Sequence, residues 1–403
     1  MPSSVNRPAR AALALAFALS AGAIPVATAA AQATGATPPD STQHRDTTPP
    51  PKPKPPLNGL DISAWVFGDF QAQTDPTAKA ANGGSVPNKF DIGRAYLTFK
   101  GPLGDRASFR VTTDIKQGGA NDTYKGWFLR LKYGFLQYDY LKPTATGVSG
   151  YARIGMLHTV IIDHEENFWP RFLTQTAVEK FGYMSSADQG VVGQLSLPNK
   201  LGEVYADVVN GTGYENPENN KYKDYQARVT LTPLGASTGL FKTLTISPWV
   251  STGGNASKFL NDPTTPVDTK LAKNRYGVFV GNRDRRLTFG ADYAQRTDDV
   301  EGATPTDGIT GVTGRLASGF VVVRPTEFVN PNAPQSVGVV ARFDHFKPNT
   351  DVDATQDFLL GGIFWEPTRK STLALDYQRL APKTGGVTGP RQESWFLHWQ
   401  LMF

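Results

Sequence analysis

From Leu57 to its last residue, the chain alternates apolar and polar side chains with a period of two. In the segment 109–116, apolar residues or threonine take the odd positions, and Arg110, Thr112, Asp114 and Lys116 take the even ones. The segment 127–135 has the same pattern, which places Tyr133 and Phe135 on its apolar face. Strict alternation predicts β-strands with one hydrated and one apolar face. About sixteen such runs occur, at 60–73, 90–100, 105–117, 126–140, 149–160, 188–197, 201–210, 222–232, 242–253, 273–281, 285–296, 312–323, 335–346, 356–366, 371–380 and 392–403.

The links between these runs alternate in length. Tight turns are predicted at 101–104, 198–200, 282–284 and 367–369, and long polar stretches lie at 74–89, 161–187, 254–272 and 297–311. Short periplasmic turns and long extracellular loops are typical of transmembrane antiparallel β-barrels of the bacterial cell outer membrane. Such a barrel begins and ends on the periplasmic side, so its strand number is even. We predict an all-β barrel of about 16 strands, with 14 or 18 as alternatives.

The last run places its aromatic and leucine residues at every second position, at Trp395, Leu397, Trp399, Leu401 and Phe403. In a soluble sheet, an apolar edge strand of this kind promotes aggregation. In a closed barrel, the strand pairs with the first one and its apolar side faces lipid. A terminal phenylalanine on such a strand also resembles the signal for the barrel insertion machinery, which we therefore expect as a partner. A soluble β-sandwich, with its apolar stripes packed together, is the alternative.

The first 56 residues precede the alternating region and divide into two parts. Arg7 and Arg10 are followed by the apolar run 11–24 and by small residues up to Ala31. This layout predicts a secretory signal peptide at 1–31, cleaved after Ala29 or Ala31, since the run is too short for a membrane anchor. Residues 32–56 contain eight prolines and little that can be buried, which predicts a disordered periplasmic linker. The barrel is then expected at 57–403.

Composition excludes several classes of protein. The chain has no cysteine, so it has no disulfides, thiolate metal sites or lipidated N-terminal cysteine. After the signal, no run of about 18 apolar residues predicts a transmembrane helix. The formal net charge of +5 becomes +3 once Arg7 and Arg10 are removed. A charge this small does not suggest nucleic-acid binding, which usually needs a concentrated basic face. We expect no nucleic-acid partner and no cofactor.

A barrel of this size encloses an aqueous lumen too wide for side chains to fill, so an inward loop has to narrow it. The longest link, 161–187, is the third long loop, and it contains apolar residues at 168, 169, 172 and 173 that a solvated segment rarely has. Folding into the pore buries them, whereas an ordinary external loop leaves them exposed; we predict the inward fold. The candidate constriction residues are Asp163, His164, Glu165, Glu166 and Arg171.

The two-residue alternation places a set of basic side chains, termed the basic wall, on the hydrated faces of the second to fifth runs. Its members are Arg94, Lys100, Arg110, Lys116, Arg130, Lys132 and Arg153. Charges on a lipid face are costly, so we expect these side chains to line the pore. A basic wall in a narrow pore raises the local concentration of anions. Two alternatives are that Asp163, Glu165 and Glu166 face and pair with this wall, or that the lining has mixed charge and no preference.

Three segments resemble the phosphate-selective porin O/P family. They are FDIGRAYLTFKG at 90–101 with SFRVTTD at 108–114, YARIGMLHT at 151–159, and the segment 172–193 with ADQGV at 187–191. The resemblance covers about 60–200 by motif and the remainder by architecture. It implies a sixteen-stranded homotrimeric porin with an inward third loop, surrounded by outer-membrane lipids and lipopolysaccharide. It also implies passage of small hydrophilic or anionic solutes such as phosphate.

An enzyme is the rival functional class. His158 and His164 lie near two glutamates, but they are six positions apart in a loop and lack the helical HExxH frame of a metal site. A linker of about 25 residues is too short for the plug domain of an active transporter. We therefore expect a diffusion channel with a modest preference for anions rather than catalysis. A weakly selective general-diffusion porin is the first alternative, and an outer-membrane barrel enzyme is the second.

Overall fold

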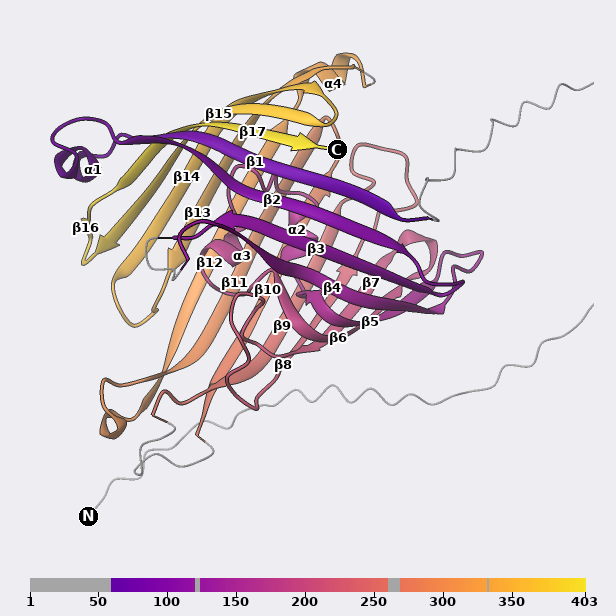
Figure 1. The fold of residues 1–403 in the computed structure, drawn as a ribbon, viewed down its shortest axis with the longest axis horizontal. Coiled ribbons are helices and arrows are strands. Elements are labelled where there is room, and N and C mark those ends of the chain that lie inside the picture. Colours follow the sequence, from indigo (N-terminus) through magenta and orange to yellow (C-terminus); the bar gives the residue numbers. More distant parts are fainter. Residues whose placement is uncertain (1–58, 120–123, 260–268, 332) are drawn as a thin grey trace, which may run out of the picture. The chain divides into compact units, whose positions relative to one another are not determined.

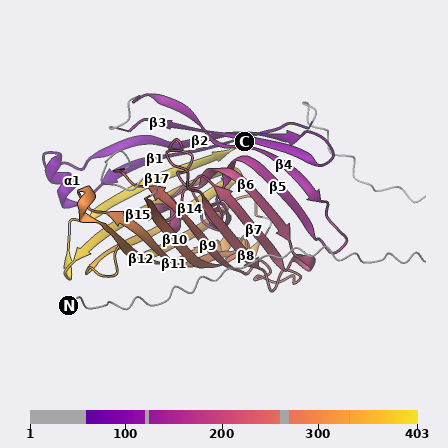
Figure 2. The ribbon, with the colours of Figure 1, turned by 90° about the horizontal axis from the view of Figure 1, so that it is seen from below.

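The structure is a computed structural model that describes residues 59–119, 124–259, 269–331 and 333–403. The predicted signal peptide (1–31) and linker (32–56) lie outside the described residues. The described residues form one antiparallel sheet that closes on itself (Figure 1). In Figure 2, β2 to β5 lie along one side of the ring and β9 to β12 along the opposite side.

Within the described part of the chain, sixteen strands form the barrel wall, and a seventeenth, β16 (Val387–Thr388), is a two-residue hairpin arm. The wall strands are β1 (Asp61–Gln73), β2 (Asn88–Pro102), β3 (Ala107–Gln117), β4 (Trp127–Leu141), β5 (Ser149–His158), β6 (Ala187–Ser196), β7 (Gly202–Val209), β8 (Asp224–Leu231), β9 (Thr245–Ala256), β10 (Lys270–Arg283), β11 (Leu287–Glu301), β12 (Ile309–Val323), β13 (Ser336–Lys347), β14 (Ala354–Thr368), β15 (Ser371–Thr384) and β17 (Gln392–Met402). Pairing of β1 with β17 closes the ring, with Trp65 opposite Met402. The predicted fold class and all sixteen predicted runs are confirmed.

The barrel begins and ends at the edge that carries the short turns. The predicted turn at 198–200 is present, with Asn199 and Lys200 in the left-handed region at φ 55° and 59°. Two connections at this edge are longer: 232–244, and 324–335 with helix α4 (Pro325–Val329). The bounds predicted for the loop at 297–311 were too wide, because β11 continues to Glu301 and β12 already begins at Ile309. Strands that rise above the membrane meet water on both faces and so lose the alternation used for the prediction.

The outer face of the barrel is apolar. Trp395, Leu397 and Leu401 of the last strand keep 45–47% of their surface exposed, and Phe403 keeps 67%. Outward-facing residues of other strands, such as Phe343, are similarly exposed. A continuous ring of this kind places the apolar stripes against lipid hydrocarbon rather than against each other. The prediction for the terminal strand is therefore confirmed, and the soluble sandwich is excluded.

Short helices occur in the connections. They are α1 (Pro76–Ala81), α2 (Ile162–Glu166), α3 (Ala177–Lys180), α4, and the 3₁₀ turns η1 (Pro198–Lys200) and η2 (Pro305–Asp307). None of the helices in the described ranges is long and apolar enough to cross a membrane.

The connection from β5 to β6, residues 159–186, is termed loop 3, and it fills part of the lumen. Ile161, Ile162 and Val178 are fully buried, and Trp169 and Leu173 are almost so. These side chains join one hydrophobic cluster with inward-facing residues of the wall. The core of the protein is thus formed by loop 3 and the inner face of the sheet, and the predicted inward fold is confirmed.

One prediction about side-chain direction was wrong. Tyr133 and Phe135 are 3% and 8% exposed and point into the lumen, although strict alternation placed them on the apolar face. Thr113 pairs with Leu131 while Thr112 pairs with Tyr133, so Lys132 is an extra residue on β4. Such a β-bulge shifts the alternation by one position and turns every following side chain to the other face.

Candidate constriction site

Loop 3 crosses the lumen from β5 and packs against the inner face of β8 to β15, termed the far wall. Aromatic contacts fix it there: Trp169 lies 5.0 Å from Phe320 of β12, and Phe181 lies 4.7 Å from Phe346 of β13, measured between ring centroids. Because the loop lies on the far wall, space is left beside the inner face of β2 to β5, termed the near wall.

Far-wall arginines hold the backbone of loop 3. Arg342 donates to the Gln175 carbonyl at 2.6 Å, and Arg228 and Arg275 donate to the carbonyls of Val160 and Tyr183. Each of these arginines also pairs with a carboxylate: Arg228 with Glu203, Arg275 with Asp298, and Arg342 with Asp344. Loop carbonyls inside a barrel have no sheet partner, so they need side-chain donors of this kind.

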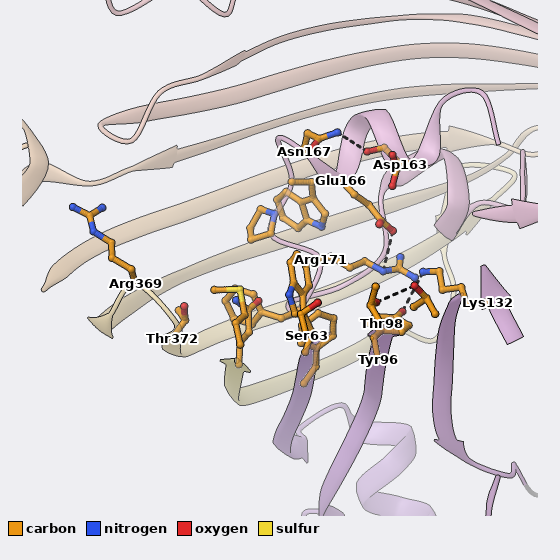
Figure 3. A pocket seen from close by; sticks show the side chains of 18 of the residues that line it. Ser63, Tyr96, Thr98, Lys132, Asp163, Glu166, Asn167, Arg171, Arg369 and Thr372 are labelled. Atoms are coloured by element: carbon orange, nitrogen blue, oxygen red, sulfur yellow. Dashed lines mark hydrogen bonds and ion pairs between the residues drawn. The ribbon is translucent and has the colours of Figure 1, made fainter. Parts of the chain in front are cut away.

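A cavity of about 530 Å³ lies between loop 3 and the first four strands (Figure 3). Lys100, Arg110 and Lys132 line it from the near wall. Asp163, Glu166 and Arg171 line it from loop 3. The fold therefore brings three residues of each predicted set to one cavity. Three arginines of the periplasmic turns, Arg285, Arg324 and Arg369, lie at its border.

Three near-wall cations on neighbouring strands are supported by aromatic rings. Arg110 lies 4.8 Å from the Tyr133 ring, Lys132 lies 4.5 Å from the Tyr96 ring, and Arg153 lies 4.1 Å from the Tyr151 ring. Their hydrogen-bond partners are neutral groups such as Thr112, the Tyr96 hydroxyl and Gln137. Among the described residues, no carboxylate lies within ion-pair distance of these three cations. A ring holds a cation without cancelling its charge.

The other four members of the predicted wall lie beside acids or at its ends. Arg94 and Arg130 both bind Asp114, and Arg130 also pairs with Glu215 at 2.5 Å. Lys100 pairs with Asp61 at 3.1 Å near the periplasmic edge. Lys116 lies at the opposite end, above the Phe128 ring. The net positive charge of the near wall is therefore concentrated at Arg110, Lys132 and Arg153.

The connection 210–223, termed loop 4, covers the upper part of the near wall. The Tyr214 hydroxyl lies 3.1 Å from Arg94 and 3.2 Å from both Arg130 and Asp114. Arg130 stacks on the Tyr214 ring at 4.7 Å. The nearby arginines lower the pKa of the Glu215 carboxyl, although its partial burial opposes them. Glu215 therefore keeps its negative charge beside Arg130.

Loop 3 turns its polar residues in different directions. Asp163 lies 3.3 Å from His158. Glu166 pairs with Arg171 at 3.2 Å (Figure 3). Arg171 also binds Glu179. Asp163 and Glu166 therefore lie at the cavity, as the alternative with acids facing the basic wall requires.

Glu165 and His164 do not face the near wall, so the predicted pairing of Glu165 with that wall was wrong. Glu165 is 1% exposed and lies beside Asp292 of β11 and Thr176. Burial, with the charge of Asp292, raises the pKa of the Glu165 carboxyl. His164 contacts Ser247 of β9 at 2.9 Å, and burial lowers the pKa of its imidazole. Consecutive residues of a helix point about 100° apart, so Asp163 and Glu166, three positions apart, share one side of α2, and Glu165 points away from it.

Comparison with known proteins identifies the architecture. No protein-family model matches the sequence, and no characterised protein matches it by sequence. The anion-selective porin from Comamonas acidovorans superposes with a TM-score of 0.55 at 10% identity, over 85% of this chain and 99% of that one. A loop L8 deletion mutant of OmpT, an outer membrane protein of Vibrio cholerae, gives 0.54 at 11% identity, over 85% and 99%. The outer membrane channel DcaP of Acinetobacter baumannii gives 0.52 at 13% identity, over 85% and 97%.

The chain has the porin fold. At these identities the likeness establishes the fold alone, and membership of the phosphate-selective porin O/P family stays a prediction. A closed barrel of this fold, with an apolar outer face, lies in the bacterial outer membrane.

Several residues of this porin-fold site were missed from the sequence. Tyr133 and Phe135 were missed because the bulge at Lys132 has no sequence signal in the alternation. Tyr214 and Glu215 lie in a loop, where no periodicity predicts a direction. The histidines and acids near loop 3 do not assemble into a centre: in the described ranges, no group of three such residues is placed to hold a metal ion.

Proposed function

We propose that this chain is a porin that forms a water-filled diffusion channel for small hydrophilic solutes, with a modest preference for anions such as phosphate. One observation carries the proposal: Arg110, Lys132 and Arg153 line the near wall with no carboxylate partner among the described residues. In a narrow channel with low-dielectric walls, such charges raise the local concentration of anions. Arginine also presents a donor fork that matches phosphate oxygens.

Loop 3 limits this preference. Asp163 faces Arg110 and Lys132 across the cavity, and its closest basic partner is the imidazole of His158. Arg171 is shared between Glu166 and Glu179, so this group of loop 3 carries one net negative charge. The uncompensated charge at the cavity is therefore small, and we expect a modest rather than a strict preference. A weakly selective general-diffusion porin is the second candidate, and it is favoured by the same Asp163.

Bilayer conductance tests the proposal. The purified protein should give stable open channels, and its reversal potential in a salt gradient should report a preference for anions. Arg110→Glu changes the wall by two charges. A unit charge about 8 Å from an ion in water contributes about 0.5 kcal/mol. The change of about 1 kcal/mol acts on anions and cations with opposite sign, so the anion-to-cation permeability ratio should fall roughly thirtyfold at low salt, where screening is weak.

Arg106→Glu is the matched control, because it makes the same charge change at the exposed periplasmic turn after β2. It should leave the permeability ratio unchanged. A cation preference in the wild-type channel contradicts the role of the near wall but leaves the channel intact. Absence of conductance, with turnover of a substrate, contradicts the channel itself.

Two further proposals concern assembly and processing. We propose a homotrimer, as the O/P resemblance implies, and expect slow gel migration of the unheated protein that converts to the monomer position on heating. We also propose removal of residues 1–31, with residues 32–56 as a periplasmic linker before the barrel. N-terminal sequencing of the exported protein should begin at Ala30 or Gln32.

A further inference from the structure

A row of polar residues crosses the outer face of β11 to β15. Gln295 stands opposite Arg315, Arg315 opposite Lys347, and Thr355 opposite Lys383. The side chains on either side of them along the strands, such as Leu316 and Phe346, are buried in the lumen. By alternation, the row therefore points away from the lumen. It lies towards the loop edge, opposite the edge that carries the chain ends of the barrel.

Arg315 and Lys347 are like charges placed directly opposite on paired strands. Such a pair is unfavourable unless something between the two side chains compensates the charges. Within the described ranges, neither side chain has a carboxylate at ion-pair distance. Arg315 donates through Nε to the neutral Gln295 oxygen at 3.2 Å. The pair therefore presents two positive charges outward with nothing in the described chain to neutralise them.

The carboxylate of Asp357 lies close to the row, but it already interacts with Lys383 and His345. Asp357 accepts from Lys383 at 2.6 Å and lies 2.7 Å from His345. These contacts account for both carboxylate oxygens. The row has three basic side chains, Arg315, Lys347 and Lys383, and Asp357 compensates only Lys383. Two positive charges therefore remain, at Arg315 and Lys347.

The row lies just above the apolar belt. The next row towards the turns holds Tyr293 with the polar pair His345 and Asp357, and Phe343 and Leu359 lie one row further down; Tyr293, Phe343 and Leu359 are exposed on the outer face. Lysine and arginine are costly against hydrocarbon and are favourable at the level of anionic headgroups. The positive pair is thus placed just above the acyl chains of the outer leaflet.

We infer that Arg315 and Lys347 form a docking site for the phosphate groups of lipopolysaccharide. The two cations suit a phosphorylated glycolipid, since arginine supplies a planar donor fork and lysine a compact charge. The apolar belt, which includes Phe343 and Leu359 two rows below, suits the acyl chains of the same molecule. A free phosphate ion does not fit as well, because the row lies on an open convex wall with no enclosing groups. This inference uses the membrane location of the barrel and is independent of channel function.

The test measures binding of lipid A to the full-length protein purified from outer membranes. The probes are phosphatidylcholine vesicles that contain either bisphosphorylated or dephosphorylated lipid A. The test variant is Arg315→Gln with Lys347→Gln, and the matched control is Arg106→Gln with Lys142→Gln at the periplasmic turns. The test variant should bind bisphosphorylated lipid A roughly thirtyfold more weakly, if each cation contributes as a basic residue near an anionic leaflet does. The control should bind like the wild type.

Three outcomes overturn the inference: equal binding by the test variant, equal binding of dephosphorylated lipid A, and displacement of lipid A by millimolar inorganic phosphate. The single variant Lys347→Gln, with roughly a fivefold expected loss, replaces the double variant if that barrel does not fold. Reversal potentials should be the same for wild type and variant, because the row lies outside the lumen. A failure of this inference is therefore distinguishable from a failure of the channel proposal.

Discussion

The near and far walls use arginine in opposite ways. On the far wall, Arg342 is almost fully buried, pairs with Asp344 and donates to a loop 3 carbonyl. On the near wall, Arg110 and Arg153 have rings and neutral hydrogen-bond partners instead. Aromatic rings do not make the difference, since Arg342 also lies 4.7 Å from the Trp169 ring. The carboxylate makes the difference. Arg342, beside Asp344, has a structural role, whereas Arg110 and Arg153 lack a carboxylate and keep a positive charge that can act on solutes.

The difference follows from what each wall has to hold. The far wall carries a loop whose backbone is inside the barrel, so donors are required there, and burying them without an acid is costly. The near wall faces the remaining lumen, where Arg110 and Arg153 stay partly exposed to water, whereas Lys132 is buried against aromatic rings. A carboxylate beside an arginine thus predicts a structural role for that arginine in this barrel. Four substitutions test this difference between the two walls.

The largest effect is expected from Arg342→Met. It leaves Asp344 buried without its partner and the Gln175 carbonyl without its donor. Breaking a buried pair in this way typically costs about 3–5 kcal/mol. The free energy of unfolding in denaturant should fall by about this amount, and channel noise should increase as loop 3 loosens. The double variant Arg342→Met with Asp344→Leu should recover much of the loss; if it does not, the carboxylate is not the reason.

The second change is Glu165→Gln on the far-wall side of loop 3. Burial beside Asp292 raises the pKa of Glu165, so the folded protein holds this proton more tightly than the unfolded chain does. Stability should therefore fall as pH rises from the ordinary glutamate value of 4.5 through the raised pKa. The unfolding midpoint of Glu165→Gln should depend less on pH over this window. Asp351→Asn, in an exposed loop, should keep the wild-type profile, and an unchanged profile for Glu165→Gln contradicts the assignment.

A smaller effect is expected from Glu215→Gln in loop 4. This substitution removes a negative charge 2.5 Å from Arg130 and so converts a paired near-wall arginine into a less compensated one. One unit charge at about 8 Å changes the energies of anions and cations by about 0.5 kcal/mol in opposite directions, so the anion-to-cation permeability ratio should increase about fivefold at low salt. The reversal potential measures it. Glu218→Gln, in the same loop and paired with Lys223, is the control, and an equal shift in both variants assigns the effect to the loop in general.

The smallest effect is expected from removing a supporting ring. Tyr133→Leu takes away the surface on which Arg110 lies and one that Lys132 approaches at 5.3 Å. The charges stay but are less well positioned, since a cation–ring contact contributes on the order of 1–2 kcal/mol at a largely desolvated site such as this. The preference for anions should decrease by less than in Arg110→Glu. Tyr133→Phe keeps the ring and should match the wild type; a loss in that variant assigns the effect to the hydroxyl.

The sequence by itself determined the barrel. Alternation depends on which solvent each face of a strand meets, and the alternation of short and long links depends on the two sides of the membrane, so both are local signals. They predicted sixteen strands, the lipid-facing terminal strand and the burial of Trp169 in an inward loop. They also predicted that a basic wall and loop 3 line one lumen.

Tertiary structure alone decided which of these charges remain uncompensated. The bulge at Lys132, the turn of Glu165 towards Asp292 and the reach of Glu215 to Arg130 each depend on contacts between segments far apart in the chain. Periodicity assigns a side chain to a face, but it does not assign its partner. The electrostatics of the channel depend on those partners, because an arginine beside a carboxylate and an arginine beside a ring differ by a full charge.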